Sequence, residues 1–175
     1  RTYPMKGTID ASIENAKELI LSDEKEMAEH VMVVDLLRND LSMVSKKVRV
    51  ERFRYIEKFK AGDKELLQVS SEIVGDLEEK WHENIGDIIS RLLPAGSISG
   101  TPKRSSVEII HRLEGYERGY FTGIFGVYDG TVLDSGVMIR FLEQTPQGVV
   151  FKSGGGITLL SEMQKEYDEL CAKVY

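Results

Sequence analysis

Residues 23–74 read DEKEMAEHVMVVDLLRNDLSMVSKKVRVERFRYIEKFKAGDKELLQVSSEIV, and this stretch decides the fold class. Its first part repeats apolar residues every three or four positions, which predicts a helix over about 23–44. The middle of that helix is apolar nearly all round, so we expect it to be buried. The runs 47–59 and 66–74 predict two strands joined through Ala61-Gly62-Asp63. A helix followed by two directly joined strands indicates an α+β protein with an antiparallel sheet, not repeated βαβ units.

The rest of the chain predicts further helices and a second group of strands. Asp129-Gly130 is typical of a tight hairpin turn, and Ser161 with Gln164 forms a capping box at the start of a last helix. The expected helices cover about 12–21, 82–92, 101–113 and 161 to the C-terminus, and the expected strands cover 120–128, 132–142 and 148–152.

Composition limits the classes of partner and compartment. The 175 residues carry a formal net charge of −6 and no basic run that outweighs it, so we expect neither nucleic acid nor a membrane surface as a partner. No apolar stretch approaches the length of a membrane span. A single cysteine, Cys171, rules out a disulfide within the chain and favours a cytoplasmic location. The chain opens at Arg1 without an initiator methionine, so we expect it to be cut from a longer protein.

Several carboxylates are candidates for binding a metal ion. Glu29 lies inside the apolar helix, and a buried carboxylate needs either an ion-pair partner, such as Lys25 four residues earlier, or a metal ion. On the last helix Glu162, Glu166 and Glu169 share one face, which by itself is typical of any surface helix. If these groups converged with Glu29, their oxygens would suit a hard cation such as Mg²⁺.

Two glycine-rich stretches, 95–103 and 153–158, come directly before predicted helices. Glycine lets a backbone approach a ligand closely, and helix N-termini offer free N–H groups to anions. Neither stretch has the P-loop or the dinucleotide-binding pattern. Together with Lys6 in a turn and Arg140, they indicate a site for a small polyanion.

Read together, these segments resemble the chorismate-utilising enzymes, a family that includes anthranilate, aminodeoxychorismate, isochorismate and salicylate synthases. The resemblance implies a layered αββα fold with antiparallel sheets, in which residues 1–175 are the C-terminal portion of a single domain and the N-terminal half is missing. The segments that carry it follow the family's order along the chain: 4–8 (PMKGT), 29–41 (EHVMVVDLLRNDL), 94–103 (PAGSISGTPK), 123–126 (GIFG), 139–140 (IR) and 154–158 (GGGIT) with Glu166, Glu169 and Lys173.

The resemblance also implies roles for individual residues. The ligands of Mg²⁺ are then Glu29, Glu169 and, partly through water, Glu166. The groups that hold the two carboxylates of chorismate are Arg140, Lys173 and the amides around Gly155 and Gly156. The loop that lines the substrate ring carries Ser97 and Thr101. The family's general-acid glutamate precedes residue 1, so we expect residues 1–175 alone to be inactive.

Lys6 favours one branch of the family. Anthranilate synthases typically carry alanine at this position, whereas the aminodeoxychorismate synthases carry a lysine that adds to C2 of chorismate, so that ammonia enters at C4. Such covalent catalysis needs the neutral amine. Ser90, where many anthranilate synthases have histidine, points the same way. The implied reaction is the amination of chorismate for p-aminobenzoate and folate synthesis, with ammonia from a glutamine amidotransferase subunit or domain.

Two alternatives stay open. Within the family the alternative is anthranilate synthase component I, which Lys6 and Ser90 disfavour. Thr101 stands where alanine is common in both amino-transferring branches and threonine occurs in the isochorismate branch, and Val127 replaces a common tyrosine, so these two positions do not decide the branch. A non-catalytic module that keeps the fold but not the chemistry is the second alternative. The charged set of Glu29, Arg140, Glu166, Glu169 and Lys173 is intact, which argues against such decay.

Overall fold

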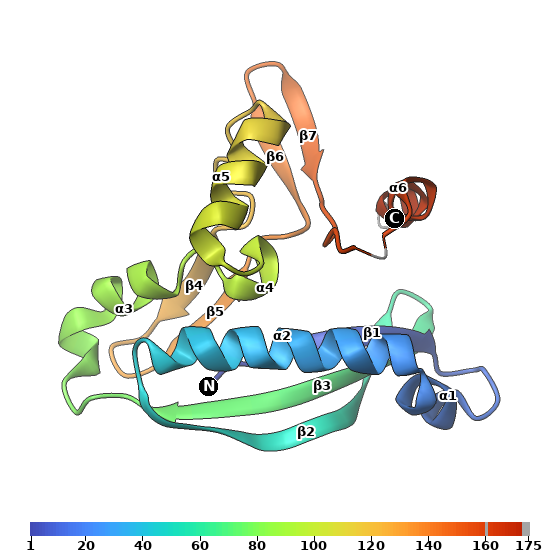
Figure 1. The fold of residues 1–175 in the computed structure, drawn as a ribbon, viewed down its shortest axis with the longest axis horizontal. Coiled ribbons are helices and arrows are strands. Elements are labelled where there is room, and N and C mark those ends of the chain that lie inside the picture. Colours follow the sequence, from blue (N-terminus) through green and yellow to red (C-terminus); the bar gives the residue numbers. More distant parts are fainter. Residues whose placement is uncertain (160, 173–175) are drawn as a thin grey trace. The chain divides into compact units, whose positions relative to one another are not determined.

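The computed structural model describes residues 1–159 and 161–172, and the chain divides into two compact units, Arg1–Glu108 and Ile109–Tyr175 (Figure 1). The elements of the first unit are β1 (Met5–Asp10), α1 (Ala16–Ser22), α2 (Glu24–Ser42), β2 (Lys46–Ala61), β3 (Lys64–Asp76), the 3₁₀ helix η1 (Trp81–Asn84), α3 (Ile85–Leu92), α4 (Gly96–Ser99) and the first part of α5 (Lys103–Glu114). The second unit continues with the end of α5, then β4 (Ile124–Tyr128), β5 (Leu133–Val137), β6 (Phe141–Thr145), β7 (Gly148–Lys152) and α6 (Met163–Ala172). Among the described residues, no helix is both long and apolar enough to cross a membrane.

The first unit is built on a three-stranded antiparallel sheet in the order β1-β3-β2. The predicted hairpin is confirmed, because Ala61 pairs with Lys64 across the turn at Gly62 and Asp63. The central strand, β3, is buried continuously over residues 69–74. A central strand has neighbours on both edges, which explains why serines and a glutamate lie inside together with valines and an isoleucine.

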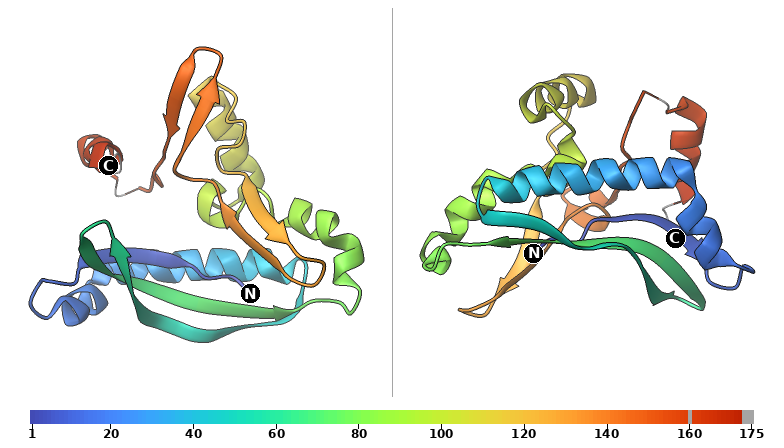
Figure 2. Two further views of the ribbon diagram at one scale, coloured as in Figure 1. Left: turned by 180° about the vertical axis from the view of Figure 1, so that it is seen from behind. Right: turned by 60° about the horizontal axis from the view of Figure 1, so that its bottom comes forward.

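The helix α2 runs along one face of this sheet (Figures 1 and 2). It starts as predicted, because the Asp23 carboxylate accepts a hydrogen bond from the N–H of Glu26 at 2.9 Å. Its contact with the sheet forms a core of Val34, Leu41 and Ile73. The expectation that the helix is buried all round is wrong, because only the stripe that faces the sheet and the end covered by the loop 93–102 are buried. The apolar residues on its other faces, Met27, Val31 and Met32, are about half exposed.

The second unit contains two separate hairpins, β4–β5 and β6–β7. The turn predicted at Asp129-Gly130 is confirmed, but the single strand predicted over 132–142 is divided into two. Met138 makes the last backbone hydrogen bonds of the first hairpin, with Thr122 and Gly123 just before β4. From Phe141 onward the chain pairs with β7 instead. Arg140 therefore lies between two strands and not within one.

Some predicted helix ends shift for local reasons. α1 begins at Ala16 and not near Ser12, because the Asp10 side chain accepts hydrogen bonds from the N–H and the hydroxyl of Ser12 and holds a turn there. The predicted capping box does not form. The Ser161 hydroxyl accepts a hydrogen bond from the N–H of Thr158, and Gln164 donates to Asp168.

Candidate active site

Lys6 and Glu29 are in direct contact in the first unit. The ammonium nitrogen of Lys6 lies 2.6 Å from Oε2 of Glu29, and that of Lys25 lies 3.8 Å from Oε1. The Glu29 side chain is 23% exposed, whereas Lys25 is 73% exposed. The ion pair expected between Glu29 and Lys25 is thus confirmed at 3.8 Å, and the shorter contact with Lys6 was not expected.

A bulge in β1 sets the position of Lys6. Met5 pairs with Ser70 and Thr8 pairs with Gln68, so that β1 contains one residue more than β3 between these pairs. Gly7 lies in the bulge with a φ of 91°, a conformation that side chains rarely adopt. There is also little room at this position, since a Cβ on Gly7 would lie 3.1 Å from Oε2 of Glu26 and 3.5 Å from Ile20.

His30 follows Glu29 on α2, and its side chain is fully buried between α2 and β3. Its Nε2 is 2.7 Å from the hydroxyl oxygen of Ser71, which also accepts a hydrogen bond from the N–H of Arg54 at 2.9 Å. Burial lowers the pKa of His30, and the nearby backbone carbonyl of Lys6 partly offsets this effect. The histidine is therefore a structural residue that fixes the turn of α2 next to Glu29.

The loop 93–102, with the short helix α4, is attached to the other end of α2. The Asp40 carboxylate is 4% exposed and accepts hydrogen bonds from the N–H of Gly96 at 2.6 Å and from Nζ of Lys103 at 2.7 Å. Ser97, predicted to contact substrate, is partly buried in this loop, and Thr101 is exposed. The loop thus carries both predicted ring-lining residues between two attachment points.

The second unit carries the remaining predicted residues. Arg140 is exposed between β5 and β6, and Gly155 and Gly156 are exposed in the segment between β7 and α6. On α6, Glu166 is in the first turn and partly buried, and Glu169 follows one turn later and is exposed. Lys173 lies outside the described residues.

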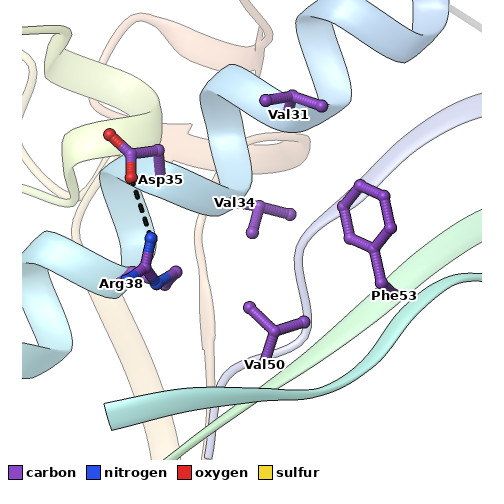
Figure 3. A pocket seen from close by; sticks show the side chains of 6 residues that line it. All are labelled: Val31, Val34, Asp35, Arg38, Val50 and Phe53. Atoms are coloured by element: carbon purple, nitrogen blue, oxygen red, sulfur yellow. Dashed lines mark hydrogen bonds and ion pairs between the residues drawn. The ribbon is translucent and has the colours of Figure 1, made fainter.

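α2 and β2 also border an open depression whose lining is mostly apolar (Figure 3). The lining residues are Val31, Val34, Asp35, Arg38, Val50 and Phe53. Its one acid and one base pair with each other, with 3.2 Å between Arg38 and Asp35. Because no further charge lines it, this depression does not offer the fixed positive groups that a small dianion requires.

The model of the chorismate binding enzyme family matches residues 1–175. The chain belongs to this family. A PabA-like protein of Pasteurella multocida is 56% identical over 174 residues, which cover 99% of this chain and 54% of that protein. The chain therefore spans about half the length of this relative.

Relatives from two branches of the family are equally similar to the chain. The anthranilate synthase component 1 of Aquifex aeolicus is 35% identical and matches 96% of this chain and 33% of its own length. The aminodeoxychorismate synthase component 1 of Bacillus subtilis is also 35% identical and matches 99% of this chain and 37% of its own length. The crystal structure of anthranilate synthase component I from Streptococcus pneumoniae superposes with a TM-score of 0.74 at 31% identity, over 98% of this chain and 38% of that one. The predicted fold is thus confirmed, whereas overall similarity does not separate the two reactions.

The structure brings some of the predicted chorismate-binding residues together. Lys6 and Glu29 touch, and Ser97 and Thr101 share one loop. Within residues 1–108, all of which are described, no group of three or more acidic, histidine or cysteine side chains is placed to hold a metal ion. The expected magnesium site needs Glu166 and Glu169 of the second unit as well, and it stays a prediction. The first of its ligands fits by donor type, because Glu29 is a partly buried carboxylate and Mg²⁺ prefers oxygen ligands; the ammonium group of Lys6, 2.6 Å from Oε2, would have to give up this contact when the ion binds.

Asp40 and Lys103 are the residues whose importance was not predicted. Both lie within segments that resemble the family, but no role was assigned to them. One signal was available: Asp40 is a charged residue eleven positions after Glu29 on the same helix, which is close to three full turns and places both on nearly the same face. The partner of Asp40 could not be found from sequence, since Lys103 is separated from it by 63 residues.

Proposed function

We propose that this chain is part of the component I of aminodeoxychorismate synthase, which replaces the C4 hydroxyl of chorismate with an amino group. The observation that carries the proposal is the contact between Lys6 and Glu29, at 2.6 Å. It supports the proposal because it puts Lys6, a residue that distinguishes this branch, beside the carboxylate expected to hold the metal, and the metal in turn is expected to bind the substrate. A lysine directed into solvent would not support a covalent role.

The proposed reaction has two displacement steps. The ammonium group of Lys6, paired with Glu29 before substrate binds, first loses its proton. The neutral amine then forms a bond to C2 of chorismate, both ring double bonds shift by one position away from C2, and the C4–O bond breaks, with the hydroxyl accepting a proton and leaving as water. Ammonia then forms a bond to C4, both double bonds shift back, and the C2–N bond to Lys6 breaks. The lysine amine is regenerated and the product, 4-amino-4-deoxychorismate, leaves with its new nitrogen protonated.

The other residues bind and orient the substrate in this proposal. Glu29, Glu166 and Glu169 would hold Mg²⁺, which when bound would neutralise the ring carboxylate and assist the departure of the hydroxyl. Arg140, Lys173 and the amides around Gly155 and Gly156 would bind the carboxylates, since fixed charges and dipoles replace the water that a dianion loses. Ser97 and Thr101 would lie along the ring.

The rest of the proposed enzyme lies beyond these 175 residues. Ammonia would come from a glutamine amidotransferase subunit or domain, and a separate lyase would convert the product to p-aminobenzoate for folate synthesis. The general acid for loss of the hydroxyl would also lie outside residues 1–175. We therefore expect these residues alone to form no product from chorismate and ammonia.

Anthranilate synthase is the second candidate, because one such enzyme is as similar to the chain as an aminodeoxychorismate synthase is. The two reactions differ at the carbon that ammonia attacks. A lysine at position 6 occupies C2 during turnover and directs ammonia to C4, whereas a small residue leaves C2 open. Lys6 is therefore the residue on which the choice between the two reactions depends.

The test is the substitution Lys6→Ala in the full-length protein, with Lys25→Ala as its matched control. Both lysines pair with Glu29, but Lys25 is largely exposed and lies farther from it. Loss of the covalent route should lower the rate of aminodeoxychorismate formation by several powers of ten, each worth about 1.4 kcal/mol. Loss of an exposed ion pair is worth about 1 kcal/mol at most, so Lys25→Ala should change the rate by less than about fivefold.

Chorismate binding should survive in Lys6→Ala, because the carboxylate contacts lie elsewhere. Amination at C2 could also appear, since that carbon becomes accessible. If Lys6→Ala formed aminodeoxychorismate at the unaltered rate, the nucleophile role would be wrong.

A further inference from the structure

The loop 93–102 is closed by one lysine and one aspartate. Nζ of Lys103 donates to Oδ1 of Asp40 at 2.7 Å and to the carbonyl oxygen of Leu92 at 3.4 Å. Leu92 is the last residue of α3 and Lys103 is the first residue of α5. The ammonium group therefore joins the helix before the loop to the helix after it, and it satisfies a free carbonyl at the end of α3.

The same aspartate holds the loop at a second point. Oδ2 of Asp40 accepts a hydrogen bond of 2.6 Å from the N–H of Gly96, the first residue of α4. A Cβ on Gly96 would lie 3.0 Å and 3.3 Å from the two carboxylate oxygens. This position therefore favours glycine, because a side chain would force the carboxylate away from the amide.

Stability alone does not account for this arrangement. Asp40 is 4% exposed and the Lys103 side chain 25% exposed, and an ion pair removed from water gains little over a well-packed apolar pair. What the carboxylate supplies is a fixed distance and direction for two specific donors, the Gly96 amide and the Lys103 ammonium. Such contacts reduce the freedom that a loop loses on binding a ligand, and that loss weakens binding.

We infer that Asp40 and Lys103 are positioning residues, which hold the loop of Ser97 and Thr101 in its binding conformation before substrate arrives. The ligand of the loop is chorismate only if the proposed function is right. α2 then serves both parts of the site. It carries Glu29 near one end and, about 16 Å further along nearly the same face, the anchor of the substrate loop.

The test compares Asp40→Asn with Asp35→Asn in the full-length protein. Asparagine keeps an acceptor for Gly96 but loses the charge that holds Lys103. The control removes a carboxylate from the same helix that pairs only with Arg38 and is 75% exposed. Two readouts are required: hydrogen exchange of the amides of residues 96–100 without substrate, and KM and kcat for chorismate.

In Asp40→Asn we expect the exchange rate of these amides to rise at least about tenfold. KM should rise about tenfold and kcat should change less than about threefold, because the loop would bind the substrate and the transition state more weakly by the same amount. Asp35→Asn should leave all three unchanged. Lys103→Met, which keeps the Asp40–Gly96 bond, should give a smaller change in the same direction and replaces Asp40→Asn if that variant does not fold.

Faster exchange with unaltered KM would show a purely structural contact and overturn the inference, as would unaltered exchange. A full-length protein that does not bind chorismate would contradict the proposed function. In that case the exchange rates alone would still show whether Asp40 and Lys103 order the loop.

Discussion

At the scale of single residues, the position of Lys6 depends on its neighbour. Gly7 lies in the β1 bulge with a φ of 91°, and the space where a side chain would stand is occupied by Glu26 and Ile20. The bulge changes the alternation of side chains along β1, and Lys6 thereby reaches Glu29 on α2. Gly7 is thus required twice, for its backbone conformation and for its small size.

Three glycine substitutions in the full-length protein separate these two requirements. Gly7→Ala combines an unfavourable φ with close contacts and should lower the free energy of unfolding by about 2–3 kcal/mol. Gly62→Ala has a φ of 61° but no atom within 4 Å, so it should cost about 1 kcal/mol. Gly86→Ala lies in α3 with open space around it and should be neutral or stabilising by up to about 1 kcal/mol. Urea unfolding measures all three, and an equal effect of Gly7→Ala and Gly62→Ala would contradict the close packing at the bulge.

At the scale of elements, the structures that depend on signals within a few residues were predicted correctly. The Asp23 cap and the turn at Gly62 and Asp63 act within a few residues, and both α2 and the β2–β3 hairpin are confirmed. The division of the predicted strand 132–142 depends on a change of pairing partner from β4 to β7, which sequence patterns do not report. The burial of α2 was overestimated for a related reason, because periodicity does not show which apolar faces have a neighbour.

The end of α5 gives a prediction for pH dependence. Nε and NH2 of Arg118 both donate to the Glu114 carboxylate, at 2.7 Å and 2.5 Å, and these hydrogen bonds lower the pKa of Glu114 from its usual 4.5. Because the folded pKa is the lower one, this stabilisation is fully present above about pH 5 and is lost as the pH falls below 4.5 through the folded pKa.

Glu114→Gln should therefore lower the free energy of unfolding by about 1 kcal/mol at neutral pH, and the difference from the unaltered protein should shrink below pH 4.5. Glu108→Gln is the matched control, since its partner Arg104 is 93% exposed. Chemical unfolding at a series of pH values measures the difference. A gap that persisted undiminished at pH 3 would show that the ion pair is not its cause.

At the scale of the whole molecule, the residues predicted to bind chorismate and magnesium are found in both units. Within the first unit the structure joins Lys6 to Glu29, which lie 23 positions apart in the sequence, and the loop of Ser97 and Thr101 belongs to the same unit. The expected magnesium site combines residues of both units. Resemblance to a family predicted residues for substrate and magnesium, and these roles stay predictions. Sequence reasoning missed the contact of Asp40 with Lys103, because residues 63 positions apart are joined only in the fold.

The identity of the product tests the central claim most directly. The full-length protein should be incubated with chorismate, ammonia and Mg²⁺, and the product separated and identified by mass spectrometry and fluorescence. We expect 4-amino-4-deoxychorismate, which an added lyase converts to p-aminobenzoate, because the role proposed for Lys6 would direct ammonia to C4. Anthranilate as the main product of the unaltered protein would contradict the account.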